Sequence, residues 1–179
     1  MKIFEIYLKN CKCYEDKTIN FQEGINFISG VNGAGKTTII EAIGLALFNY
    51  LPYNVKQFIR EGKKSGEIQV LLEAKDERLY RIIRKFNKNS KSLKWEVYDE
   101  ETKTTLNELH GSADVSRWIK ENIGVDSEDS LEKIFEQVIA VDQGLFTAPF
   151  LETSTNRKKI FDGILKVEGY RQAFTNSRS

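Results

Sequence analysis

A glycine-rich segment near the N-terminus carries the residue types that bind phosphate. Gly30, Gly35, Lys36 and Thr37 stand in the order Gly-x-x-x-x-Gly-Lys-Thr, which is a complete Walker A motif. Glycines let the backbone curl so that consecutive amide N–H groups point at phosphate oxygens. The lysine of such a motif reaches the β- and γ-phosphates, and the hydroxyl of the threonine binds Mg²⁺. The motif therefore predicts a loop that holds ATP together with Mg²⁺.

This loop supplies most of the residues that we expect at the site. Lys36 is expected to act in catalysis as well as in binding, and Thr37 is expected to be a metal ligand. The loop residues expected to contact the nucleotide are Asn32, Gly33, Ala34, Gly35, Lys36, Thr37 and Thr38.

The segments on either side of the loop have the patterns that a phosphate-binding loop requires. Ile25–Ser29 is apolar and β-branched, which indicates a buried strand. Thr37–Phe48 has helical periodicity and ends before Pro52. The positive end of this helix would strengthen the anion site. A glycine-rich turn without a ligand is the alternative, and the strand–loop–helix context argues against it.

The remaining periodicity predicts a protein with both strands and helices. Strands are expected at 1–8, 18–21, 68–72, 79–86, 93–97 and 138–141, the third, fourth and fifth forming an antiparallel meander. Helices are expected at 113–123 and 130–137, and a last helix is capped by Thr153 or Ser154. The expected fold is α/β, with a mixed P-loop core sheet, an antiparallel β-meander and a helical subregion.

Composition limits the classes of protein that the chain can belong to. Its 179 residues are 40% hydrophobic and 30% charged, with a net charge of +1, as expected for a globular domain. No apolar run approaches the length of a membrane span, so we expect no membrane partner and a cytoplasmic location, nucleoid-associated if the source is bacterial or archaeal. Cys11 and Cys13 are too close for a comfortable disulfide, and we interpret both as ordinary thiols.

An acidic residue after an apolar run offers an alternative mechanism. Val138–Val141 is followed by Asp142, which could be the Walker B acid of a self-contained P-loop kinase or GTPase. The next residues are Gln143 and Gly144 rather than glutamate, and the chain has no Asn/Thr-Lys-x-Asp guanine motif. These features disfavour the kinase or GTPase interpretation.

The sequence resembles the start of the Rad50/SbcC/SMC family of ATPases, which have ABC-type heads. The resemblance covers MKIFEIYLKNCKCYEDKTINFQEGINFISGVNGAGKTTIIEAI, then Phe58–Gly62, then Asp142–Phe146 where relatives carry the Q-loop, and finally Leu151–Phe174. In that family one head is made from the two ends of a long chain. The resemblance thus implies an N-terminal lobe at 1–174, with a helix entering a coiled coil at about 152–174. Residues 175–179 would be a frayed end or a remnant of cloning.

The resemblance also implies further roles for individual residues. Gln143 would be a catalytic residue and a Mg²⁺ ligand, and Lys12 would contact nucleotide phosphate. Relatives mostly carry arginine at the position of Lys12. Ile59, Arg60 and Glu61 match a loop beside the base and ribose.

A function follows from the same resemblance. Two heads would dimerise across ATP and hydrolyse it, each completed by a C-terminal lobe, because this chain lacks the signature motif and an apolar run that ends in Asp-Glu. Gln143–Phe146 and the short loop between Phe48 and Phe58 favour the Rad50/SbcC branch, whose partners would be a Mre11/SbcD-type nuclease and double-stranded DNA. An SMC-type chromosome-organising ATPase is one alternative, and a nucleotide-sensing module without turnover is another.

Overall fold

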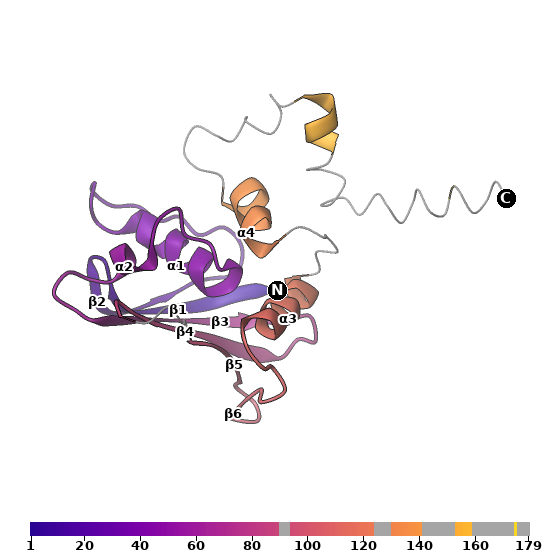
Figure 1. Ribbon diagram of the computed structural model, residues 1–179, viewed down its shortest axis with the longest axis horizontal. Coiled ribbons are helices and arrows are strands. Elements are labelled where there is room, and N and C mark those ends of the chain that lie inside the picture. The colour runs from indigo at the N-terminus through magenta and orange to yellow at the C-terminus, as the bar shows by residue number, and fades with distance from the viewer. Residues whose placement is uncertain (90–93, 124–129, 141–152, 159–173, 175–179) are drawn as a thin grey trace.

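The fold is described from a computed structural model (Figure 1). The structure describes residues 1–89, 94–123, 130–140, 153–158 and 174. The expected Q-loop at Asp142–Phe146 and the tail at 175–179 lie outside these described residues, as do residues 159–173 of the helix expected at about 152–174.

One six-stranded sheet forms the base of the molecule, in the order β2-β1-β3-β4-β5-β6. Every strand pair in the described sheet is antiparallel. The strands are β1 (Lys2–Cys11), β2 (Tyr14–Asn20), β3 (Ser65–Glu73), β4 (Leu79–Asn87), β5 (Lys94–Asp99) and β6 (Thr104–Thr105). Alternate residues of β3, β4 and β5 are buried, as the period of two in their sequences predicts.

The helices lie on one face of this sheet and leave the other face open (Figure 1). They are α1 (Lys36–Phe48), α2 (Val55–Phe58), α3 (Ser112–Ile123), α4 (Leu131–Ile134) and a π-helix, η1 (Phe135–Ile139). The core lies between α1 and the sheet, where Leu47, Ile68 and Val70 are fully buried. Its position fixes α1 over the central strands, with the glycine-rich loop at one end of the helix.

Most of the predicted elements are confirmed, including the α/β class, the meander, the helix after the loop and the helices at 113–123 and 130–137. The described part of the last predicted helix is helical at residues 154–158, and Thr153 caps its start because its Oγ1 accepts a hydrogen bond from the Asn156 amide at 3.4 Å. No helix among the described residues is long and apolar enough to cross a membrane.

Two predicted strands are wrong. Ile25–Ser29 forms no strand, so the described sheet is antiparallel rather than mixed. Its apolar side chains face solvent, with Ile25 85% and Phe27 91% exposed. The described part of Val138–Val141 lies at the end of the π-helix η1 and at its C-cap, because periodicity alone does not distinguish a short apolar run in a helix from one in a strand.

Candidate ATP-binding site

The N-terminus of α1 is open for an anion. Gly35 is the N-cap, and no described side chain caps the helix or places an acid in its first turn. The first amides of a helix have no partner within the helix, and the helix dipole makes this end positive. The backbone thus offers donors and partial positive charge to phosphate oxygens, as the Walker A motif predicts.

Left-handed glycines shape the loop that leads into this helix. Gly33 has φ = 81° and Gly35 has φ = 92°, conformations that side chains rarely adopt. A Cβ atom at Gly35 would collide with Sγ of Cys13 and would lie 2.8 Å from the ring of Tyr14. The hydroxyl of Tyr14 also donates to the Gly35 carbonyl oxygen at 3.4 Å. The turn between β1 and β2 therefore supports the loop from below, and only glycine fits between them.

The ammonium of Lys36 lies within the curve of the loop. Its Nζ donates to the carbonyl oxygens of Gly30 at 2.7 Å and Val31 at 2.9 Å. The structure describes no acidic partner for this lysine, so its charge stays available to an anion. This arrangement fits the β- and γ-phosphates of a nucleotide, with Thr37 exposed beside it and Thr38 buried beneath.

Lys12 lies on the same side of the molecule, but its charge is already engaged. The residue has φ = 46° in the β1–β2 turn. Its Nζ is 2.7 Å from Oε2 of Glu41 on α1 and 4.5 Å from the centre of the Tyr53 ring. To contact a phosphate, the Lys12 ammonium would have to leave Glu41 or bind both groups at once.

Arg60 is likewise turned toward the β1–β2 hairpin. Its Nη1 donates to the carbonyl oxygens of Lys12 at 3.1 Å and Cys13 at 2.8 Å. Ile59 is buried and pairs with Cys11 as an isolated bridge, whereas Glu61 is exposed. The Ile59–Glu61 loop is thus fastened to the turn that supports the phosphate loop.

The predicted site residues fall into two groups, those that the structure describes and Gln143. The described ones gather around the start of α1, and Asn32, Gly33 and Ala34 are exposed there. Gln143 lies outside the described residues. Sequence reasoning missed Tyr14, which supports the loop, and Glu41, which holds Lys12. No motif marks either residue, because their role depends on which turns meet in space.

The cysteines beside the loop are both free thiols, as expected. Cys11 is buried, and burial raises its pKa to about 12. Its thiol is therefore protonated at neutral pH. Cys13 is exposed next to Gly35.

Comparison with known proteins assigns the chain to a family. A family model described as an AAA domain matches residues 5–178. The chain is 30% identical over 172 residues to the "DNA double-strand break repair Rad50 ATPase" of Methanopyrus kandleri, covering 96% of this chain and 19% of that protein. The protein of the same name from Thermoplasma volcanium is 31% identical over 169 residues, covering 94% of this chain and 18% of its own length. The chain thus spans about a fifth of the length of these relatives.

A solved structure shows the same fold. The recombination mediator protein RecF, solved with ATP, aligns with a TM-score of 0.54 and 17% identity, covering 92% of this chain and 38% of that chain. This likeness shows that the two chains share an α/β fold. The family model covers nearly the whole chain, and the chain accordingly belongs to the AAA domain family, in which it resembles the N-terminal ATPase lobe of the Rad50 proteins.

Proposed function

We propose that this chain binds Mg²⁺-ATP and forms half of a Rad50/SbcC-type ATPase head. The open N-terminus of α1, with the Lys36 ammonium inside the loop, is the observation that carries the proposal. The α1 amides would bind phosphate oxygens, and Lys36 would neutralise their charge. Thr37, and Gln143 from the expected Q-loop, would hold Mg²⁺, which supplies further charge neutralisation when bound.

An exposed apolar patch supports the proposal that a C-terminal lobe completes the head. Ile25, Phe27, Val31 and Ile40 are exposed along the loop and on α1. Beside them, a cavity of ≈ 490 Å³ is lined in part by Phe4, Phe21 and Ile43. Exposed apolar groups in such number mark an interaction surface. The pattern of Ile25–Ser29 is that of a buried strand, so a sheet from the second lobe would suit it.

The proposed activity is ATP hydrolysis coupled to dimerisation of two complete heads. The DNA-repair role and the partnership with a Mre11/SbcD-type nuclease are proposed from the names of the relatives and the resemblance of the sequence. An SMC-type role is the alternative within the family. The location that we propose is the cytoplasm, with association to the nucleoid.

Substitutions at two neighbouring residues distinguish this proposal from a self-contained kinase or GTPase. We expect Gln143→Ala to lower ATP turnover of the complete head about 100-fold, because it removes a group that orients water and Mg²⁺. We expect Asp142→Ala to have a much smaller effect. Steady-state ATPase assays on both variants make the measurement. A loss confined to Asp142→Ala would instead identify Asp142 as the Walker B acid.

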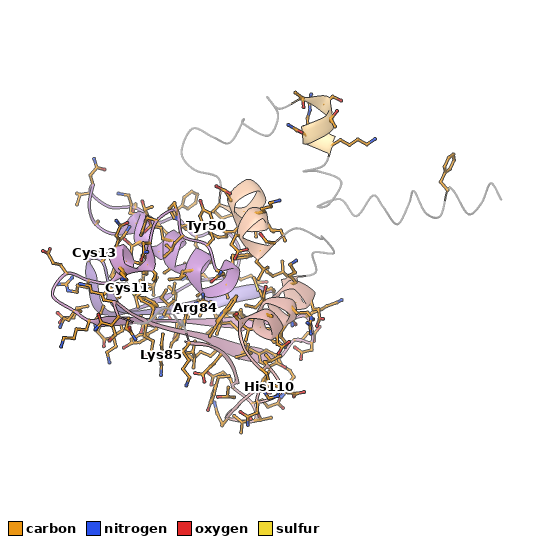
Figure 2. The ribbon with its side chains drawn as sticks, in the orientation of Figure 1. Cys11, Cys13, Tyr50, Arg84, Lys85 and His110 are labelled. Atoms are coloured by element: carbon orange, nitrogen blue, oxygen red, sulfur yellow. The ribbon has the colours of Figure 1, made fainter. Side chains whose placement is uncertain are left out.

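Contact with DNA is proposed for the open face of the sheet, where lysines stand in register. Lys85 on β4 pairs with Lys94 on β5, and Glu67 separates Lys85 from Lys9 on β1. Lys85 points away from the helices (Figure 2). Like charges directly opposite each other destabilise a sheet. Glu96 compensates part of this repulsion, with its Oε1 2.8 Å from Nζ of Lys94, and a phosphate backbone over the row would offset the rest.

Charge reversal in this row should weaken DNA binding. We expect the double variant Lys85→Glu, Lys94→Glu to bind duplex DNA more weakly at every sequence. The slope of log K against log salt should fall by about 1 for each lysine, because each phosphate contact releases a counterion. Fluorescence anisotropy across a salt series measures both quantities. The control is Lys75→Glu, at the opposite end of the strands, and equal loss in control and double variant would exclude this face.

A further inference from the structure

A buried arginine on β4 lies beside the C-terminal end of α1. Arg84 on β4 is 2% exposed, and its guanidinium carbon is 4.1 Å from the centre of the Trp95 ring (Figure 2). Its Nη2 donates to Oδ1 of Asn49, whereas Nε and Nη1 have no hydrogen-bond partner among the described residues. Burial lowers the pKa of Arg84 to about 10, so it remains charged at neutral pH. An apolar residue would cost less here if packing were the only requirement.

Asn49 joins α1, β4 and α4 through both ends of its side-chain amide. We call the hydrogen-bonded series Arg84–Asn49–Glu132 the relay. Asn49 is the C-cap of α1, in a left-handed conformation with φ = 55°. While its Oδ1 accepts from Arg84 on β4, its Nδ2 donates to Oε1 of Glu132 on α4 at 2.7 Å. Burial acts to raise the pKa of Glu132, but the hydrogen bond from Asn49 is among the interactions that outweigh it, and the pKa is lowered. The carboxylate is therefore ionised, and the amide lies between two opposite charges that strengthen both hydrogen bonds.

An aromatic contact joins η1 to α1 beside this relay. Phe135, the first residue of η1, stacks on Phe48 with ring centres 4.8 Å apart. Its ring fills a notch over Gly44, where an added Cβ would lie 2.7 Å from it. Polar and apolar contacts thus hold α4 and η1 at the C-terminal end of α1. The π-helix ends at Ile139, shortly before Gln143 in the sequence.

We propose that Asn49 and Arg84 are positioning residues for the ATPase reaction. They would hold α4 and η1 at a fixed distance from the phosphate loop, with α1 as the rigid spacer. Its 13 residues span about 20 Å, with the Walker A loop at one end and Asn49 at the other. The relay thereby fixes the position of Ile139, which comes shortly before Gln143 in the sequence. This inference rests on the proposed function, because it concerns delivery of Gln143 to ATP.

Asn49→Gly is the sharpest test, because glycine accepts the left-handed cap and removes only the relay. In the complete head, we expect kcat for ATP to fall about tenfold, as for other supporting groups behind a reaction site. The KM for ATP should stay within about twofold, because the phosphate loop is untouched. The matched control is Glu77→Gly, another non-glycine residue with positive φ (64°), in the β3–β4 turn. Steady-state kinetics of both variants give the comparison.

Two substitutions of Glu132 test whether the relay depends on the hydrogen bond that this residue accepts from Asn49. Glu132→Gln keeps an oxygen that accepts from Asn49 but loses the negative charge, so its kcat should fall less than that of Glu132→Leu. Glu132→Leu loses the acceptor and should resemble Asn49→Gly. Val115→Ala, which removes buried volume on α3, shows what loss of stability alone does to kcat. Equal kcat losses in Val115→Ala and Asn49→Gly at matched thermal unfolding would overturn the proposal.

Hydrogen exchange tests the positioning without relying on catalysis. In this chain, Asn49→Gly should speed amide exchange at residues 131–140 but leave β3 and β4 unchanged, and Glu77→Gly should not affect 131–140. Unchanged exchange at 131–140 in Asn49→Gly would refute the relay. If the wild-type head does not hydrolyse ATP, the proposed function fails, and exchange still decides whether Asn49 holds α4. If the wild type turns over and Asn49→Gly matches it, only the positioning proposal fails.

Discussion

Replacing Lys36 by alanine is expected to weaken ATP binding at least about 100-fold, equivalent to ~3 kcal/mol. The ammonium of Lys36 lies inside the phosphate loop, 2.7 Å from the Gly30 carbonyl oxygen. The other donors around the start of α1 are backbone amides, which carry only partial charge. Without the lysine, no side chain in the loop would place a full positive charge against the phosphates of the nucleotide.

Calorimetric titration with Mg²⁺-ATP measures this effect directly. Lys75→Ala is the matched control, because Lys75 is an exposed lysine in the β3–β4 turn, away from the loop. Thermal unfolding of both variants shows whether the fold is retained. Unchanged ATP affinity in a folded Lys36→Ala protein would refute the assignment of the loop as the nucleotide site.

Local periodicity accounts for the parts of the fold that the sequence predicts. The alternation in β3, β4 and β5 and the helical pattern of α1 depend on neighbours within each segment, so a single sequence reveals them. The Walker A loop is predictable for the same reason, since its glycines, lysine and threonine are adjacent in the chain. Its conformation and the open end of α1 agree with that prediction.

Contacts between distant segments account for what the sequence did not reveal. The phosphate contact of Lys12 stays a prediction, but no pattern in the sequence revealed that Glu41 from α1 pairs with its ammonium. Tyr14 supports the loop only because the β1–β2 turn folds beneath Gly35. No spacing rule connects such residues.

The segment Ile25–Ser29 fails as a strand for a different physical reason. Its apolar, β-branched composition predicts burial, but a strand needs a neighbour with which to exchange hydrogen bonds. Within the described residues, β1 pairs with β2 and β3, and none of the six strands pairs with this segment. The prediction identified a segment suited to burial without identifying what would cover it.

A second lobe that covers this segment should have the largest effect on activity. By itself, this chain should bind ATP weakly and hydrolyse it very slowly. The chain has no apolar run that ends in Asp-Glu, the pattern that would place a water-activating acid, and no signature motif to face the γ-phosphate. Groups that stabilise developing charge must be preorganised, and loss of one such donor alone costs about 10²–10³ in rate. Adding the matching C-terminal lobe should therefore raise turnover by on the order of 10³-fold or more, with ATP-dependent dimerisation of the heads.

Docking of that lobe should depend on the apolar patch. Phe27→Asp places a charge on a side chain that is 91% exposed, so it should fold normally and yet fail to gain turnover from the added lobe. Leu79→Asp is the matched control, because Leu79 is an exposed apolar residue at the start of β4. Each variant is measured alone and with the added lobe, by ATPase assay and by size-exclusion chromatography. A chain that is monodisperse and fully active without any partner would show that the half-head proposal is wrong. Equal rescue of Phe27→Asp and Leu79→Asp would place the docking surface elsewhere.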